Sequence, residues 1–446
     1  MDTLHVVADG RTRMNEPIAN ESSVSSKKAQ PSFCEAAYYW VKLGFTSFGG
    51  PAGQIAMMQS ECVDKRGWIG QGEFLRGLNY AMLLPGPEAQ QLAAYIGWRL
   101  HGVRGALFAG TAFIVPGMVF MIVLAWVAAS QGDSTLVKAL FEGVKPVVVA
   151  IIIYALWRIG SKACNTALAI GLAIAAFAAI KFGGIAFPIV VLTAGLFGVV
   201  LSGTSWGQFA GETHGRPTDD AAALSFKVAD VIRRWGTVSL WTLAVGGIPC
   251  ALALIVFGTT PYADVIKLFT TAAFVTFGGA YAVLPYIADA GVNIYGWLTP
   301  PEMINGLALA ETTPGPLILV TTYVGFFAGW KAAGLGAAVL AASLTTLVTF
   351  LPSFLFIIAG APYIEDLQAR AWARNALGAI TAAVVGVIFN LAVFFGETAL
   401  VQAGGPHWIN IIAALVAFVL LFKGWVSVPL MVALGAGFGV VTHLAF

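Results

Sequence analysis

TSFGGPAGQIAMMQ, at positions 46–59, interrupts a run that is otherwise typical of one membrane-spanning helix. The run from 33 to 58 has the length of about 20 mostly apolar residues that a span requires. Gly49, Gly50 and Pro51 oppose a continuous helix there, because glycine loses conformational entropy and proline lacks a backbone donor. Since lipid offers no hydrogen bonds to freed backbone groups, the stretch predicts a helix break that protein encloses.

The composition places this break in a multi-pass membrane protein. Of 446 residues, 58% are apolar and only 10% are charged, and the mean hydropathy is +0.82, values too apolar for a soluble protein of this length. We predict an all-α polytopic membrane protein with about 10–13 membrane segments, several of them short or broken. The segments lie near 33–58, 77–98, 105–129, 143–160, 166–181, 185–203, 237–258, 267–290, 303–328, 334–359, 376–396, 409–422 and 426–444.

The opening motif recurs in the second half of the chain. SFGGPAG at 47–53 reappears as TFGGAYA at 276–282, and LPGPEAQ at 84–90 reappears as TPGPLIL at 313–319. The same step along the sequence relates both pairs, and this constant repeat offset indicates a duplication. The repeat offset also relates two further pairs, Trp68 with Trp297 and Glu73 with Glu302.

The duplication predicts the domain organisation. We expect a disordered polar tail over 1–32, a first repeat over 33–203, a polar linker over 204–236, and a second repeat with an extra leading span over 237–446. Seven predicted crossings separate the two motifs. An odd number turns the second copy over, so we predict inverted repeats with a substrate site near the midplane.

The distribution of basic residues agrees with this topology in part. If the amino terminus lies inside, most arginines and lysines fall on the inner side, as the positive-inside rule requires. Lys65, Arg66 and Arg76 then fall outside. Either the rule is locally violated or an early segment is a re-entrant hairpin, and the sequence leaves both alternatives open.

The matched breaks predict an anion site. A helix that restarts at Gly49 and Gly50 presents backbone amides and a partial positive charge, which suits a small oxyanion. The alternative is that these glycines only allow close helix packing. The Pro-Gly-Pro triplets likewise predict a turn inside the membrane, or a kink without further function.

Three charged residues lie beside the breaks. Glu88 directly follows Pro87, and Glu311 precedes Pro314 by three residues. Carboxylates inside spans are candidates for proton coupling, with helix capping as the alternative. Lys42 either places a cation beside the glycine break or extends to the membrane interface.

Several functions are disfavoured by the sequence. Cys34, Cys62, Cys164 and Cys250 are scattered, so we expect neither a disulfide framework nor a metal site, and no cofactor motif is found. A net charge of +2 gives no indication of a nucleic-acid partner. The sequence contains no phosphate-binding loop of the GxxxxGK[ST] type and no HExxH or GxSxG motif, which argues against an ATP-driven pump and against an enzyme.

FGGPAGQI and LPGPEAQQLA in the first half, with FGGAYAVLPYI and TTPGPLILVTTYVGF in the second, resemble the chromate ion transporter (CHR) family in its long two-domain bacterial form. The resemblance covers nearly the whole chain apart from the tail and the linker. The second copy has Ala280 where the first has Pro51, and Leu317 where the first has Glu88, so we expect different roles for the two halves. The matching motif positions are Phe48, Gly49, Gly50, Pro51, Pro85, Gly86, Pro87, Glu88, Phe277, Gly278, Gly279, Pro314, Gly315 and Pro316.

The resemblance implies a multi-pass transporter of the bacterial inner membrane that exports chromate and confers chromate resistance, with sulfate as a close chemical mimic. Export suits the physics, because a dianion leaving through 100 mV gains about 4.6 kcal/mol from the membrane potential. Protons are the other candidate driving force. Uptake or exchange of sulfate, a non-transporting membrane sensor or scaffold, and assembly as a homodimer stay open at this stage.

Overall fold

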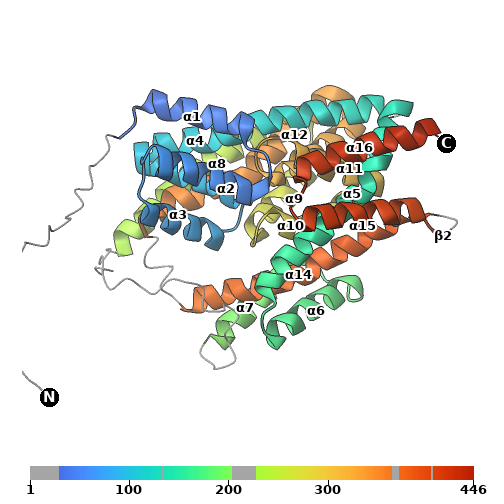
Figure 1. Cartoon of the computed structure of the whole chain (residues 1–446). Helices are drawn as coiled ribbons and strands as arrows, with labels where there is room; N and C mark the ends of the chain where they lie inside the picture. The colour runs from blue at the N-terminus through green and yellow to red at the C-terminus, as the bar shows by residue number, and fades with distance from the viewer. Residues whose placement is uncertain (1–29, 133, 203–227, 364–370, 403–404, 446) are drawn as a thin grey trace, which may run out of the picture.

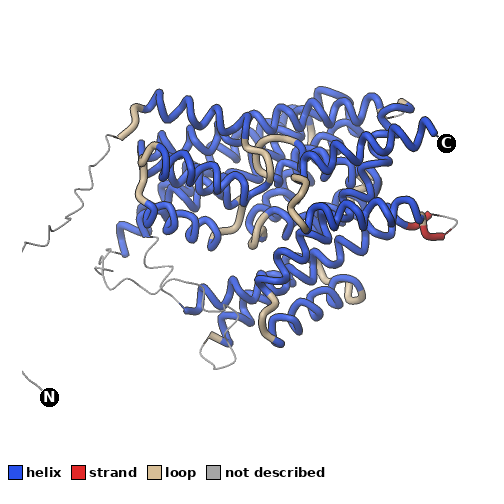
Figure 2. The backbone as a smooth tube through the Cα atoms, in the orientation of Figure 1, coloured by secondary structure: helices blue, strands red, loops and turns tan. Residues whose placement is uncertain are grey.

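The computed structural model is almost entirely helical (Figures 1 and 2) and describes residues 30–132, 134–202, 228–363, 371–402 and 405–445. The predicted tail over 1–32 and the predicted linker over 204–236 lie mostly outside the described residues. Two short antiparallel strands, β1 (Val401–Gln402) and β2 (Gly405–Pro406), are the strands of the described part. The prediction of an all-α polytopic membrane protein is confirmed.

The first half of the chain forms α1 (Phe33–Thr46), α2 (Gly50–Gln59), the π-helical turn η1 (Ser60–Lys65), α3 (Gln71–Leu83), α4 (Glu88–Gln131), α5 (Thr135–Ala163), α6 (Ala167–Lys181) and α7 (Phe187–Leu201). The second half forms α8 (Val228–Phe257), α9 (Tyr262–Val275), α10 (Ala280–Asp289), η2 (Ala290–Ile294), α11 (Pro300–Thr312), η3 (Leu317–Leu319), α12 (Val320–Gly360), η4 (Ala361–Tyr363), α14 (Ala371–Leu400), α15 (Trp408–Phe422) and α16 (Val428–Ala445).

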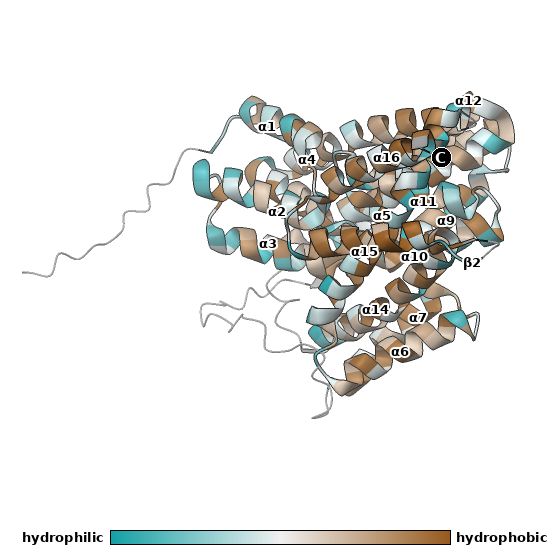
Figure 3. Ribbon diagram, turned by 45° about the vertical axis from the view of Figure 1, so that its right-hand side comes forward, coloured by the Kyte–Doolittle hydropathy of each residue, from teal (hydrophilic) through white to brown (hydrophobic). Residues whose placement is uncertain are grey.

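Five helices in the described part are long and apolar enough to cross a membrane, namely α4, α5, α8, α12 and α14. Four shorter helices, α6, α7, α15 and α16, are also apolar, and Figure 3 shows hydrophobic residues along them. The segments predicted near 33–58 and 77–98 differ from continuous spans. The first is divided at its glycine motif into α1 and α2, and the second is divided at its Pro-Gly-Pro motif into α3 and α4.

The helices α1, α2 and α3 lie together at one end of the molecule (Figures 1 and 3). Arg66 Nη1, just after η1, lies 3.0 Å from Glu35 Oε1 in the first turn of α1. Arg99, near the kink of α4, pairs with Glu73 in the first turn of α3. The start of α1, the α2–α3 turn and the α4 kink therefore share one end, and α2 with α3 forms a hairpin that returns to it.

This hairpin accounts for Lys65 and Arg66, two of the three basic residues that the predicted topology placed outside. Lys65 and Arg66 lie at the end where α1 begins, so they are on the amino-terminal side and not across the membrane from it. The structure thus favours a re-entrant hairpin over a local violation of the positive-inside rule.

Arg66 joins the hairpin to α1 and also pairs with groups within the hairpin. Its guanidinium also lies 2.8 Å from Glu61 and 4.8 Å from the centre of the Trp68 ring. The hydrogen bond from Arg66 lowers the pKa of the Glu61 carboxyl from its ordinary value, so this pair persists until the pH falls below the usual range of glutamate.

Arg66→Gln is expected to destabilise the detergent-solubilised protein by about 1 kcal/mol, seen as a lower Tm, because it removes two ion pairs and a cation–π contact. Lys65→Gln is the matched control, since the Lys65 side chain is 67% exposed and pairs with Glu61 within a single turn. Equal Tm values for the two variants would contradict the role given to Arg66.

Helix boundaries in the second half repeat those of the first. The repeat offset that takes Phe48 to Phe277 also takes both ends of α1 to those of α9, and both ends of α3 to those of α11. α4 has non-helical backbone at His101 and Gly102, and α12 has it at Ala333 and Gly334, slightly beyond the equivalent place. The second copy therefore carries a short insertion between break and kink. Figure 3 shows α9, α10 and α11 at the end opposite to α1, α2 and α3.

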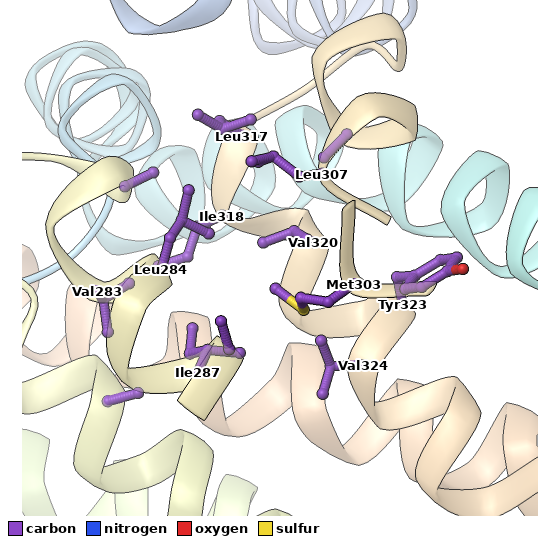
Figure 4. Packing of buried hydrophobic residues seen from close by; sticks show 14 of the residues in the cluster. Val283, Leu284, Ile287, Met303, Leu307, Leu317, Ile318, Val320, Tyr323 and Val324 are labelled. Atoms are coloured by element: carbon purple, nitrogen blue, oxygen red, sulfur yellow. The ribbon is translucent and has the colours of Figure 1, made fainter. Parts of the chain in front are cut away.

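The two long kinked helices α4 and α12 pack against each other through the middle of the molecule. The larger apolar cluster extends over both halves, and a second cluster joins the first-half helices to the end of α12. Figure 4 shows part of the larger cluster, in which α10, α11 and the start of α12 bury their aliphatic side chains against one another. This packing holds the broken segments in place.

Candidate functional site

The breaks of one half are joined by backbone hydrogen bonds to the breaks of the other half. The amide of Gly86 donates to the carbonyl oxygen of Thr276 at 2.8 Å, and the amide of Gly315 donates to the carbonyl oxygen of Ser47 at 3.1 Å. Ser47 and Thr276 are equivalent positions of the two repeats, and so are Gly86 and Gly315. Each Pro-Gly-Pro break therefore meets the glycine break of the opposite half, and the predicted broken helices come together at one place.

Gln54 completes the contact between Ser47 and Gly315. Its side-chain amide is fully buried and donates to the carbonyl oxygens of Ser47, at 3.0 Å, and Gly315, at 2.6 Å. One side chain thus gives the Ser47 carbonyl oxygen a second donor beside the Gly315 amide and supplies a donor to the Gly315 carbonyl oxygen. Carbonyl groups cost several kcal/mol if unpaired in an apolar interior. Sequence reasoning missed Gln54, although a polar amide just after a predicted helix break in an apolar run was the available signal.

Gln91 and the long helices enclose the two Pro-Gly-Pro breaks. Gln91 Nε2 donates to the carbonyl oxygen of Pro85 at 2.7 Å and lies 3.4 Å from Ser353 Oγ on α12. On the other side, Gly117 of α4 approaches Pro314 so closely that a Cβ atom on Gly117 would clash with the Pro314 carbonyl oxygen. The breaks are therefore held directly between α4 and α12.

The glycine breaks require left-handed backbone. Gly49 and Gly279 precede α2 and α10 with φ values of 94° and 93°. A Cβ atom on Gly49 or on Gly50 would meet nothing within 4 Å, so close helix packing does not explain these two residues. The alternative of close packing is thereby weakened for the first copy.

Four helices begin at the breaks, α2, α4, α10 and, through η3, α12. Pro51 lies in the first turn of α2, and Pro87 and Pro316 directly precede α4 and η3. A helix start carries a partial positive charge, so these starts favour an anion at the junction. The same positions tolerate proline, because the first amides of a helix have no partner within it.

The two carboxylates predicted for proton coupling both lie at the junction. Glu88, the first residue of α4, is half-buried, and its Oε1 would lie 3.4 Å from a Cβ atom on Gly279 of the other half. Glu311 near the end of α11 is 6% exposed and accepts a hydrogen bond from the hydroxyl of Tyr281 in the first turn of α10. Each carboxylate therefore faces the second-half glycine break.

Arg158 on α5 is a cation that sequence reasoning assigned only to membrane topology. It lies within electrostatic reach of Glu88 and of Tyr281, and its side chain is exposed. Its position inside the predicted span 143–160 was the available signal, since ionisable residues within spans are by default functional. Arg158 provides a guanidinium, the group best suited to bidentate contact with an oxyanion.

Three other predicted residues lie less centrally. Lys42 is exposed on α1, where its carbonyl oxygen accepts from the Thr46 hydroxyl at 2.9 Å. Phe48 is 43% exposed and Phe277 is half-buried against the larger apolar cluster. These contacts give no evidence that Lys42 reaches the junction.

The two halves differ in polarity at equivalent positions. Val283, Leu317 and Val320 occupy, at the repeat offset, the places of Gln54, Glu88 and Gln91. Figure 4 shows these three aliphatic side chains within the apolar cluster. The polar groups of the junction thus come mainly from the first half, which agrees with the expectation of different roles.

In the described residues, no three His, Cys, Asp or Glu side chains are grouped closely enough to hold a metal ion. The four cysteines are free thiols.

Long apolar helices around a junction of broken helices define a multi-pass membrane protein of the transporter type. The family model described as Chromate transporter matches residues 34–199 and 263–440, once in each half, and the chain belongs to this family.

The relatives support the same assignment. A chromate transport protein of Pseudomonas aeruginosa is 28% identical over 445 residues, with 94% of this chain and 97% of the relative covered. A chromate transport protein of Cupriavidus metallidurans is 27% identical, with 96% and 99% covered. The uncharacterized transporter YwrB of Bacillus subtilis is 34% identical over 123 residues, which are 28% of this chain and 62% of that protein. No solved structure matches.

Proposed function

We propose that the protein is a secondary transporter that exports chromate from the cytoplasm and so confers chromate resistance. Its family, and the chromate transport named for two relatives that cover almost the whole chain, support the substrate. The observation that carries the proposal is the junction of four helix starts with Arg158 beside it, since this arrangement suits a tetrahedral oxyanion.

The proposed mechanism is alternating access between two inverted repeats. The copies pack against each other at their breaks, along α4 and α12, and through α5, α6 and α7 against α14, α15 and α16. A rocking of one half against the other, which would open the junction to each side in turn, must therefore also shift these helix contacts. Three long crossings separate the two copies in our proposal: the second part of α4, then α5, then α8. The helices α6 and α7 are shorter and are not counted with them. An odd number of crossings supports the inverted relation.

We place the anion between the glycine breaks, held by the helix starts of α2 and α10 and by Arg158. Of the motif residues, Gly49, Gly50, Gly278 and Gly279 would supply backbone, while the prolines fix the breaks. Export from the cytoplasm of a bacterial inner membrane is the favoured direction, because the membrane potential drives a dianion out of a cell whose interior is negative.

Glu88 supplies a route to proton coupling. A dianion beside Glu88 repels the carboxylate form, so protonation of Glu88 and binding of the anion should favour each other. Chromate and sulfate binding are therefore expected to strengthen as pH falls. Transport of one proton with one dianion would still move one net negative charge, which the membrane potential drives outward.

Everted vesicles with an imposed potential and pH gradient test this proposal. Glu88→Gln should remove most of the pH dependence of anion affinity while potential-driven flux persists, because the amide imitates the protonated carboxyl. Measuring sulfate beside chromate separates effects on the protein from protonation of chromate, since sulfate stays doubly charged at these pH values. Competition between the two anions also tests the alternative of sulfate transport.

Gly50→Leu in the same assay should reduce flux by at least about tenfold, because a side chain would enter the space in which we place the anion and strain the positive φ of Gly50. Normal flux in both Gly50→Leu and Glu88→Gln would show that the substrate site lies elsewhere.

A further inference from the structure

A cavity of about 400 Å³ opens at the end of the molecule opposite to the start of α1, away from the junction of the breaks. It lies where α4 ends, α5 and α11 begin, and α12 approaches its kink. The volume exceeds that of a small tetrahedral anion with some of its water. No motif of the sequence pointed to this place.

Three lysines line the cavity, Lys138, Lys145 and Lys331, together with two carboxylates, Glu142 and Glu302, so the lining has a net charge of +1. The Lys145 side chain is only 13% exposed, whereas its ion-pair partner Glu142 is 60% exposed. Lys145 Nζ donates directly to Glu142 Oε1, so these two charges lie side by side, with the carboxylate side chain the more exposed of the two. The positive net charge of the lining therefore comes from the remaining lysines.

The second carboxylate is largely engaged by the protein itself. Glu302 Oε2 accepts from the amide and the hydroxyl of Thr299, at 2.6 and 2.9 Å, in the cap of α11. Lys331 Nζ lies 3.8 Å from the same oxygen, which is beyond hydrogen-bond distance. The Lys331 ammonium therefore has N–H donors that Glu302 does not occupy, and these donors can bind a ligand.

The inner wall carries buried polar atoms without a protein partner. The hydroxyl of Tyr323, a fully buried residue, and Oδ1 of Asn305 find no hydrogen-bond partner among the described residues. Figure 4 shows the Tyr323 hydroxyl directed away from the apolar cluster that holds its ring. Buried polar groups normally have partners, so a ligand or water in the cavity would complete them.

We propose that this cavity is a second oxyanion site, on the face opposite to the amino terminus, that binds a tetrahedral dianion through Lys145, Lys331 and the Tyr323 hydroxyl. The inference rests on the proposed transport of oxyanions only for its role, which is to hold the anion after it leaves the junction. A pair equivalent to Glu302 and Lys331, Glu73 with Arg99, lies at the opposite end, where the anion would enter.

Equilibrium binding of radiolabelled chromate, and separately of sulfate, to the purified full-length chain in lipid nanodiscs tests the inference. We expect two binding components in the wild type. The double variant Lys145→Gln with Lys331→Gln should weaken one component by about tenfold and leave the other unchanged, since charge-assisted hydrogen bonds are lost in one place. Tyr323→Phe, which keeps the packed ring, should weaken the same component several-fold.

Lys267→Gln is the matched control, because Lys267 is an exposed lysine of the second half that does not line the cavity. A single component in the wild type, or two unchanged components in the double variant, would overturn the second site even if chromate flux is normal. The second site and the proposed function can also be separated. If the double variant loses one binding component while the wild type moves no chromate across vesicles, the second site is supported and the proposed function is overturned.

Discussion

Arg158→Gln is expected to raise the chromate concentration needed for half-maximal flux by at least about tenfold. The guanidinium of Arg158 is the cation within electrostatic reach of Glu88 and Tyr281 at the junction. One hydrogen bond to a charged group contributes about 1.5–3 kcal/mol, which corresponds to a change in affinity of roughly 10- to 150-fold. Chromate flux from everted vesicles, measured over a range of concentrations, gives this value.

Two variants on the same helix serve as controls for Arg158. Arg158→Lys keeps the charge but loses the bidentate fork, so we expect it to recover only part of the affinity. Lys162→Gln removes an exposed positive charge one turn further along α5 and should leave the affinity close to that of the wild type. An equal loss in Arg158→Gln and Lys162→Gln would mean that general surface charge, and not contact with the anion, explains the effect.

Gly86→Val is expected to prevent most of the protein from reaching its folded state. Gly86 has a φ of +122°, which a β-branched residue adopts only with strain. A Cβ atom there would lie 2.5 Å from Ser353 Oγ and 2.8 Å from Gln91 Nε2. Strain of about 1–3 kcal/mol is added to overpacking of about 1–3 kcal/mol, and the upper end of this sum reaches the lower end of the stability of about 5–15 kcal/mol that folded proteins have.

The amount of monodisperse protein in detergent and its Tm measure this effect. Gly171→Ala is the matched control, because Gly171 lies within α6 and a Cβ atom there meets nothing within 4 Å. Adding Ser353→Gly to Gly86→Val relieves the clash with the Ser353 hydroxyl but not the strained φ, so we expect partial recovery only. A normal yield of the single variant would refute the close approach seen at Gly86.

The sequence predicted the places where helices break, because glycine and proline act locally. It also predicted that both halves carry the same breaks, and the structure adds that the repeat offset relates both ends of α1 to those of α9. The direction of the short helices was not predictable in this way. A hydropathy pattern records how many apolar residues follow one another, and it is the same whether α2 continues the path of α1 or folds back from the break.

The candidate site was predicted in its backbone and only partly in its side chains. Glu88 and Glu311 were identified because a carboxylate in an apolar run is conspicuous. Arg158 belongs to α5, whereas Glu88 begins α4, and nothing local in the sequence connects them. The contacts of Gln54 with Gly315 likewise depend on the packing of one half against the other, which no single segment encodes.

Lys42 is a candidate from the sequence that the structure does not bring to the junction. It lies six residues before Phe48 in the sequence, which suggested a cation beside the glycine break. On α1 its side chain is exposed, whereas the charge of Arg158, on α5, acts on Glu88 at the junction.

The hydrogen bonds from Gly86 to Thr276 and from Gly315 to Ser47 make each half of the chain depend on the other during evolution. Each half supplies the acceptor that the other half's Pro-Gly-Pro turn requires, so neither half on its own can complete its interior. The two halves are thus mutually dependent, and a substitution that alters one turn must be tolerated by the residues that meet it in the other half of the chain.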